Sequence, residues 1–181
     1  NKLSARYKEH PSFPIKKDIE EELKNFKVKN KKTRKISSFD EICDEETLDI
    51  AISNWLDNIS SVDYKIKEAH EYTMILPESY YGPGSYSNWI RVGWALASTD
   101  SKMLLTWIKF SSQSKEFDWN DIPELFETWK SFDFDNPDNL TYRSIMYWAK
   151  RTSPIEYSKI RENTVDYFIG QSLSGTEFDL A

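Results

Sequence analysis

The chain has 181 residues, of which 39% are hydrophobic, 15% aromatic and 30% charged, and its net charge is −6 at pH 7. This length fits one domain or one small domain with appendages, and the negative charge argues against a protein whose whole surface binds nucleic acid. The single cysteine excludes an internal disulfide framework, and no apolar run approaches the roughly 20 residues that span a bilayer. The first residue is Asn and no signal peptide follows it, so we expect an intracellular piece of a longer polypeptide.

The first 43 residues are predicted to form an appendage and a linker. Residues 14–26 begin with a proline and carry apolar side chains on one helical face, whereas residues 27–43 form a charged linker without apolar periodicity. A block of basic residues without any acid crosses the boundary between them. Its members are Lys24, Lys27, Lys29, Lys31, Lys32, Arg34 and Lys35. Such a block is either a solvated linker or a segment that follows a phosphate backbone.

Residues 44–169 are predicted to form a helical domain. Asp44 can cap a helix that has apolar residues at helical spacing up to Ile59. The pattern is weakest over residues 61–85, where 72–76 is a short apolar run that fits a strand or an extended segment. The Gly-Pro-Gly sequence at 82–84 requires a loop.

From residue 86 onward the pattern is strongly helical. Helices are predicted at 86–98, at 100–112, at 122–131 with a proline in its first turn, after a Thr141 cap, and from 154 to about 168. Residues 170–181 are predicted to form a flexible tail. The fold class is therefore mainly α, a small helical bundle with an N-terminal helical or extended appendage and a basic linker.

The helix at 86–98 contains a glycine, Gly93, between two tryptophans. A glycine inside a helix costs roughly 1 kcal/mol against alanine, so we expect a close approach of the helix that carries Trp107. Five tryptophans are in phase with aliphatic residues and are predicted to pack in the core: Trp55, Trp89, Trp107, Trp129 and Trp148. Trp94 and Trp119 are expected to be the more exposed ones.

Several short motifs imitate chemical sites, and each has a simpler interpretation. Asp133 and Asp135 could share a divalent metal, but they lie in a Pro/Asn-rich loop where turn and cap chemistry explains them. Residues 170–176 have the glycine spacing of a phosphate loop without its lysine. No recognisable set of further metal ligands, and no basic partner at a known spacing, accompanies the three remaining candidates, His10, His70 and Cys43. We therefore predict no metal, no cofactor and no catalytic residue in this chain.

Four aromatic-rich segments recur in a characteristic order: residues 86–96, 105–111, 126–129 and 144–149. Together they resemble the type 2 primase C-terminal domain of primase–helicases from nucleocytoplasmic large DNA viruses and related mobile elements. The residues that carry the resemblance are Trp89, Gly93, Leu96, Trp107, Phe110, Trp129 and Trp148. In that family the domain lies between an archaeo-eukaryotic-type primase and a superfamily 3 helicase, and residues 1–26 resemble the end of such a primase domain.

The resemblance implies a non-catalytic linker domain that couples primase to helicase in viral DNA replication, with both of those domains in the same polypeptide as partners. DNA, single-stranded or template, would be held by the basic block and by Arg91. The parent polypeptide would synthesise primers and hydrolyse ATP with a divalent metal, at viral replication sites in the host cytoplasm or nucleus. The negative net charge leaves an alternative open, a protein–protein docking module without nucleic-acid binding.

Overall fold

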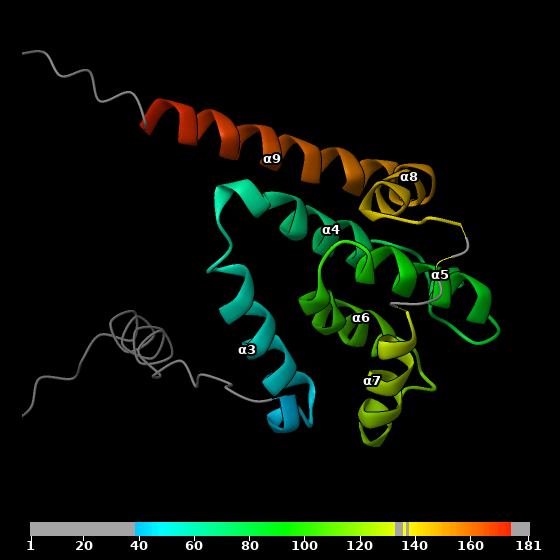
Figure 1. Ribbon diagram of the computed structural model, residues 1–181. Helices are drawn as coiled ribbons and strands as arrows, with labels where there is room; N and C mark the ends of the chain where they lie inside the picture. Colours follow the sequence, from blue (N-terminus) through cyan, green and yellow to red (C-terminus); the bar gives the residue numbers. More distant parts are fainter. Residues whose placement is uncertain (1–38, 133–135, 137, 175–181) are drawn as a thin grey trace, which may run out of the picture. The chain divides into compact units, whose positions relative to one another are not determined.

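The computed structural model of the chain describes residues 39–132, 136 and 138–174, and these residues form seven α-helices and no strand (Figure 1). The helices are α3 (Glu45–Leu56), α4 (Tyr64–Met74), α5 (Tyr86–Ala97), α6 (Leu104–Ser111), α7 (Ile122–Ser131), α8 (Tyr142–Thr152) and α9 (Pro154–Ser174). Short 3-10 turns lie at η1 (Phe39–Glu41), η2 (Ser61–Asp63), η3 (Glu78–Tyr80), η4 (Ser101–Met103) and η5 (Trp119–Asp121). The predicted mainly α fold is confirmed.

The chain divides into two units, residues 1–34 and 35–181, and the described residues all belong to the second. The predicted helix at 14–26 and residues 27–38 of the predicted linker lie outside the described residues. The domain boundaries at 26 and 43 stay predictions, whereas the boundary at 169 falls inside α9, which continues to Ser174.

Helix starts follow the local capping chemistry that the sequence predicts. Asp44 Oδ1 accepts a hydrogen bond from the Thr47 backbone N–H at 2.8 Å, and the Thr47 hydroxyl accepts one from the Asp44 N–H at 3.2 Å. Thr141 and Ser144 form the same reciprocal pair at the start of α8. Each pair satisfies backbone donors that a helix N-terminus leaves open. Both predicted caps are confirmed.

Two predicted element boundaries are wrong. The segment at 72–76 is not a strand, because Tyr72 and Thr73 lie in α4 and are fully buried with Ala69 on its inner face. The polar His70 and Glu71 between these positions conceal the helical spacing in the sequence. The last helix runs to Ser174 rather than to about 168, so the predicted tail begins inside α9; residues 175–181 lie outside the described part. One glycine costs roughly 1 kcal/mol, which is too little to end a helix without a cap or a proline after it.

The core is built around Trp107 of α6, which is fully buried. The Trp89 ring stacks on it with the centroids 4.5 Å apart, and the Phe132 ring meets it edge-on at 5.1 Å. A Cβ atom on Gly93 would lie 2.6 Å from Phe132 Cε2 and 3.1 Å from Trp107 Cε2. The predicted close approach at Gly93 is therefore confirmed, and Phe132 is the neighbour that the sequence did not indicate.

The other tryptophans differ less in their burial than the sequence predicted. Trp129 is buried, and the half-buried Trp55, Trp89 and Trp148 pack against the core, as expected. The expectation of exposure for Trp94 and Trp119 is wrong, since both are half-buried and also pack against the core. Edge-on aromatic contacts explain this, because Trp94 meets Phe132 and Trp119 meets Phe117.

Helices α6, α8 and α9 all pack against helix α4 (Figure 1). Toward α6, His70 Nδ1 lies 2.9 Å from the Thr106 hydroxyl. Toward α9, the Thr164 hydroxyl donates to Glu68 at 3.1 Å. Burial lowers the pKa of His70 to about 4, so this side chain is neutral at pH 7 and serves the packing of α4 on α6. With their inner faces held on α4, helices α8 and α9 turn their outer faces to solvent.

Candidate nucleic-acid interface

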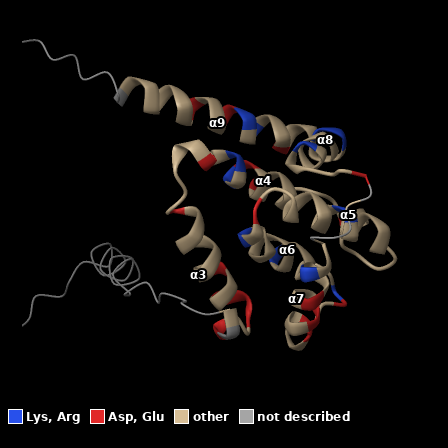
Figure 2. Ribbon diagram, viewed as in Figure 1, with Lys and Arg blue, Asp and Glu red and all other residues tan. Residues whose placement is uncertain are grey.

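Helix α8 presents a basic and aromatic face to solvent. The face consists of Arg143, Tyr147, Lys150 and Arg151, which are all exposed. Their spacing of four, seven and eight residues places them on one side of the helix, while Ile145 and Ala149 are fully buried on the other side. No acidic residue occurs in α8. Figure 2 shows blue Lys and Arg residues on α8, whereas red acidic residues gather on α3 and α7.

Tyr147 and Arg151 are held together on this basic face of α8. Arg151 Nη1 donates a hydrogen bond to the Tyr147 hydroxyl at 3.1 Å, and the guanidinium lies 5.6 Å from the ring centroid. Tyr147 remains 57% exposed. Within the part of the chain that the structure describes, no acid forms an ion pair with Arg143, Lys150 or Arg151. Three cations and an open aromatic ring are thus available to an anionic ligand.

Arg91, the described member of the predicted DNA-binding set, lies next to this face but is partly engaged. Its guanidinium lies 5.4 Å from the Trp148 ring centroid, and its Nε lies 3.4 Å from Asp138 Oδ2. Burial raises the pKa of Tyr80, and the positive charges of Arg91 and Arg151 oppose this rise, so both cations lie near one hydroxyl. Arg91 therefore extends the basic surface of α8 with a partly neutralised charge.

A small hollow continues the basic surface at the start of α8. It has a volume of about 290 Å³ and is lined by Lys65, Ser98, Thr99, Thr141, Tyr142 and Arg143. Among its described lining residues are two cations and three aliphatic hydroxyl groups but no carboxylate. The surface suited to phosphate groups therefore reaches from the outer face of α8 to the first turn of α4.

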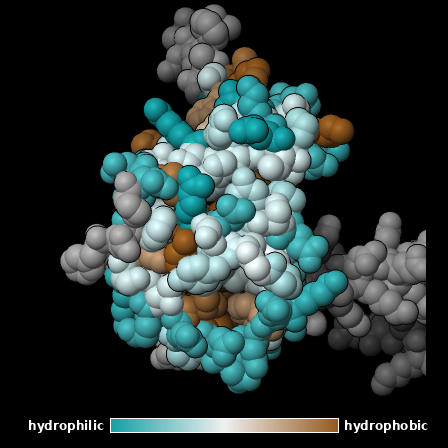
Figure 3. All heavy atoms as spheres, turned by 90° about the vertical axis from the view of Figure 1, so that its right-hand side faces the viewer, coloured by the Kyte–Doolittle hydropathy of each residue, from teal (hydrophilic) through white to brown (hydrophobic). Residues whose placement is uncertain are grey.

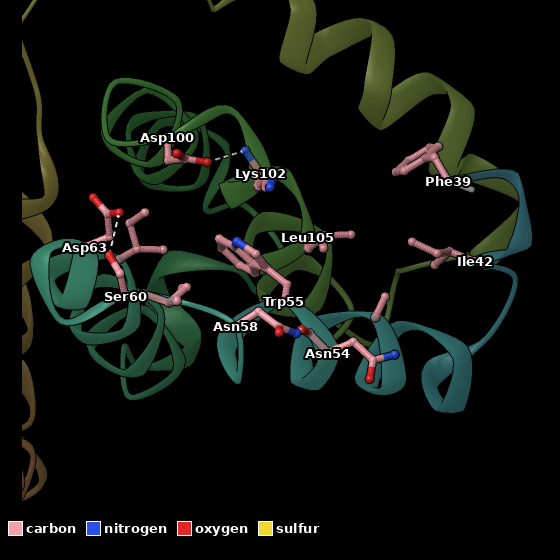
Figure 4. Close-up of a pocket in the computed structure, with 13 residues that line it drawn as sticks. Phe39, Ile42, Asn54, Trp55, Asn58, Ser60, Asp63, Asp100, Lys102 and Leu105 are labelled. Carbon is pink, nitrogen blue, oxygen red and sulfur yellow. Dashed lines mark hydrogen bonds between the residues drawn. The ribbon is translucent and has the colours of Figure 1, made fainter. Parts of the chain in front are cut away.

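A larger hollow on the described residues has a different chemistry (Figure 4). It has a volume of about 750 Å³ and an apolar lining that includes Ile42, Trp55 and Leu105. Asp63 and Asp100 also line it, with Lys102 as the single cation among its described lining residues. Carboxylates repel a polyanion, so this hollow suits a protein segment better than DNA. Figure 3 shows, from the right-hand side of Figure 1, a mostly hydrophilic surface with a hydrophobic hollow in its lower half.

The other predicted site residues either lie outside the described part of the chain or are not brought together in it. The basic block Lys24–Lys35, His10, Asp133 and Asp135 lie outside the described residues. Residues 170–174 are helical, so they do not form a phosphate loop. Cys43 is exposed. Among residues 39–132, 136 and 138–174, no group of three or more His, Cys, Asp or Glu side chains could hold a metal ion, and no helix is long and apolar enough to cross a membrane.

The basic face of α8 was not predicted, although the sequence contains a signal for it. The run from Arg143 to Arg151 has three cations and no acid within a chain that is acidic overall. The predicted helix after Thr141 would have placed these cations together on the side opposite its apolar residues. The denser basic block at 24–35 is the stronger signal in the sequence and conceals this weaker periodic one.

Comparisons with known proteins match the region from α4 to α8. Residues 69–149 match the family model described as Primase C terminal 2 (PriCT-2). African swine fever virus proteins named "Putative primase", from a Kenyan pig isolate and a Namibian warthog isolate, are each 33% identical to this chain over 104 residues. The match covers 55% of this chain and 10% of each relative, so the chain spans about a tenth of their length. Residues 69–149 are thus similar to the type 2 primase C-terminal family, in agreement with the resemblance of the aromatic helices.

Proposed function

We propose that this chain is a non-catalytic helical domain of a viral DNA primase–helicase, which connects primase to a superfamily 3 helicase and holds single-stranded template or primer DNA. The family match and the primase names of the relatives support the replication context. Primer synthesis, ATP hydrolysis and the divalent metal would belong to other parts of the polypeptide. The proposal places that polypeptide at viral replication sites in the host cytoplasm or nucleus.

The basic face of α8 is the observation that carries the DNA contact. Arg143 and Arg151 are eight residues apart, a distance of about 12 Å along the helix axis. This equals the length of roughly three to four nucleotides at the 3.4 Å spacing of one DNA strand. The cations would bind phosphate groups, and the exposed Tyr147 ring would stack on an unpaired base. A stacking ring favours single-stranded over double-stranded DNA, because bases in a duplex are already stacked.

Fluorescence anisotropy with a labelled single strand over a salt series tests this contact. The variant Arg143→Ala/Lys150→Ala/Arg151→Ala should bind at least tenfold more weakly, and the slope of log K against log salt should fall by about 2, at roughly 0.7 per lost phosphate contact. The matched control is Lys102→Ala/Lys115→Ala/Lys130→Ala, which removes three exposed lysines elsewhere for the same change in net charge. Equal losses in the two variants would contradict a specific role of α8.

The predicted contribution of the basic block needs its own variant. Substituting Lys29, Lys31, Lys32 and Arg34 by Ala should weaken binding further if this segment also follows the phosphate backbone. An effect of the α8 variant alone would assign the contact to α8.

The non-catalytic assignment has its own test. The intact chain, wild type or variant, should make no primers and hydrolyse no ATP. Metal-dependent primer synthesis by the pure chain would contradict this assignment.

A protein–protein docking module without DNA contact is the second candidate function. The observation in its favour is the large hollow of Figure 4, with its apolar lining and two carboxylates, in a chain of net charge −6. This candidate predicts no binding of single-stranded DNA even at low salt, whereas the first predicts the tightest binding there.

A further inference from the structure

The hollow at the start of α8 is formed by three segments that are far apart in the sequence. Lys65 comes from the first turn of α4, Ser98 and Thr99 follow the end of α5, and residues 141–143 begin α8. Its volume is about 290 Å³. A ligand in this hollow would therefore contact several elements at once, whereas a ligand on the outer face of α8 contacts one helix.

Hydrogen bonds fix the walls of this hollow. The Ser98 hydroxyl donates to the carbonyl of the buried Leu140 at 2.6 Å, and the Leu140 N–H donates to Asn136 Oδ1 at 2.9 Å. These bonds tie the segment before α8 to the end of α5. The Thr99 hydroxyl donates to the Ala95 carbonyl at 2.8 Å. The hollow is thus preformed, and the hydroxyl protons of Ser98 and Thr99 are already used, so any donor to a ligand must come from the other lining groups.

The other polar lining groups suit a doubly charged anion. Lys65 and Arg143 are exposed, and neither forms an ion pair with an acid in the described part of the chain. The Thr141 hydroxyl accepts from the Arg143 N–H at 3.3 Å, which leaves its proton for a ligand. A phosphate inside a DNA strand carries one negative charge, whereas a phosphate monoester carries about −1.5 to −2 at pH 7. Two cations therefore match the charge of a monoester, which a strand has only at its end.

Acidic residues beside the hollow end the basic surface there. Asp63 precedes Lys65 by two residues, and Asp100 directly follows Thr99. Both acids line the larger hollow of Figure 4, and neither is among the described residues that line this one. A DNA strand that continued beyond the hollow would bring its next phosphate toward these carboxylates, which repel it. The strand can therefore extend from the hollow in one direction, along the outer face of α8.

The spacing on α8 agrees with a strand that ends in the hollow. Tyr147 lies four residues after Arg143, a distance of about 6 Å along the helix axis. This is roughly the length of two nucleotides at the 3.4 Å spacing of one strand. A terminal phosphate beside Arg143 would thus leave the first or second base within reach of the exposed Tyr147 ring.

We propose that the hollow at the start of α8 binds the terminal phosphate monoester of a DNA strand, at its 5′ or its 3′ end. Lys65 and Arg143 pair with the phosphate oxygens, and the Thr141 hydroxyl donates a hydrogen bond to one of them. This site rests on the proposed DNA contact of α8 and adds to it a preference for strand ends. Two solvent-exposed ion pairs should raise the affinity for a phosphorylated strand by roughly three- to tenfold.

Competition anisotropy with the full chain tests this preference. Unlabelled strands of one short sequence, with a 5′-phosphate, a 3′-phosphate or hydroxyl groups at both ends, compete against a labelled strand without phosphate at its ends. At least one phosphorylated strand should compete roughly three- to tenfold better than the unphosphorylated one. Lys65→Ala should bring this ratio close to one with an unchanged circular dichroism spectrum. The matched control is Lys102→Ala, which removes the same charge at an exposed position that lines the larger hollow, and it should keep the wild-type ratio.

The outcomes separate this site from the DNA contact on which it rests. Equal competition by all strands would overturn the terminal-phosphate site and leave the α8 contact intact, whereas no binding of any strand would overturn both. A ratio that Lys65→Ala retains, or that both lysine variants lose equally, would also overturn the site. Inorganic phosphate provides the last arm, because loss of the preference at a phosphate concentration equal to that of the competing strand would assign the hollow to free phosphate instead.

Discussion

Helices α8 and α9 are neighbours whose inner faces are chemically similar, whereas their outer faces differ: that of α8 is basic and that of α9 is apolar at its end. Both pack on α4 through small or aliphatic residues, such as Ala149 in α8 and Ile160 in α9. The outer face of α8 has three cations and a tyrosine, while the outer face at the end of α9 has Val165, Ile169 and Leu173. The inner faces determine the fold, so the outer faces are where two helices of one bundle can differ in the partner they bind.

Lys and Arg side chains in this domain differ in whether they already form an ion pair with a carboxylate. Lys109 of α6 is a cation within 2.7 Å of Glu45 and 2.9 Å of Asp49, and its charge is used to hold α3 on α6. The cations of α8 have no such acidic partner among the described residues. A count of Lys and Arg therefore says less about DNA binding than the positions of the acids around them.

The largest expected effect comes from the scaffold that both outer faces share. Gly93→Leu would add a branched side chain at a position where even a Cβ atom would lie 2.6 Å from Phe132 Cε2, so α5 and α6 could not pack. We expect loss of the cooperative thermal transition, together with loss of DNA binding. Gly170→Leu is the matched control, since nothing lies within 4 Å there, and it should keep the transition. A normal transition in Gly93→Leu would contradict this packing.

The sequence predicted features that depend on near neighbours in the chain. Caps at Asp44 and Thr141 need only residues within one turn, and the cost of Gly93 is visible in the helix that contains it. Phe132 as the residue that crowds Gly93, the helical state of Tyr72 and Thr73, and the half-burial of Trp94 depend on contacts between distant segments. The outer faces of α8 and α9 could not be identified from residue spacing alone, because a helical pattern does not say which side faces the core. Identifying them required the burial of each residue in the structure.

Acid should weaken the scaffold beneath both faces. Folded protein keeps His70 neutral down to a pKa of about 4, whereas the unfolded chain takes up the proton below about 6.5. The stabilisation is thus complete above pH 6.5 and decreases as the pH falls toward 4, by roughly 3 kcal/mol in total. Urea unfolding at several pH values measures this loss. His70→Gln should flatten the dependence in that window, and an unchanged slope in this variant would assign the acid sensitivity to carboxylates instead.

Removal of the aromatic ring should affect the α8 face alone. Tyr147→Ala should weaken binding of single-stranded DNA by about 1–2 kcal/mol if a base stacks on the ring, while Tyr147→Phe should retain most of the affinity. Equal losses in the Ala and Phe variants would instead assign the effect to the hydrogen bond between the Tyr147 hydroxyl and Arg151.

The smallest expected effect distinguishes a paired cation from an available one. Burial by itself would lower the pKa of Lys109, but its hydrogen bonds to Glu45 and Asp49 raise it, so the charge is stabilised within the protein. Lys109→Met should therefore cost at most about 1 kcal/mol of stability, by loosening α3, and should leave DNA affinity within twofold of wild type. Arg151→Met removes the same unit of charge and should weaken DNA binding severalfold without loosening α3. If Lys109→Met weakened DNA binding as much as Arg151→Met, net charge rather than the position of the cations would control the interaction, and the distinction between the two regions would fail.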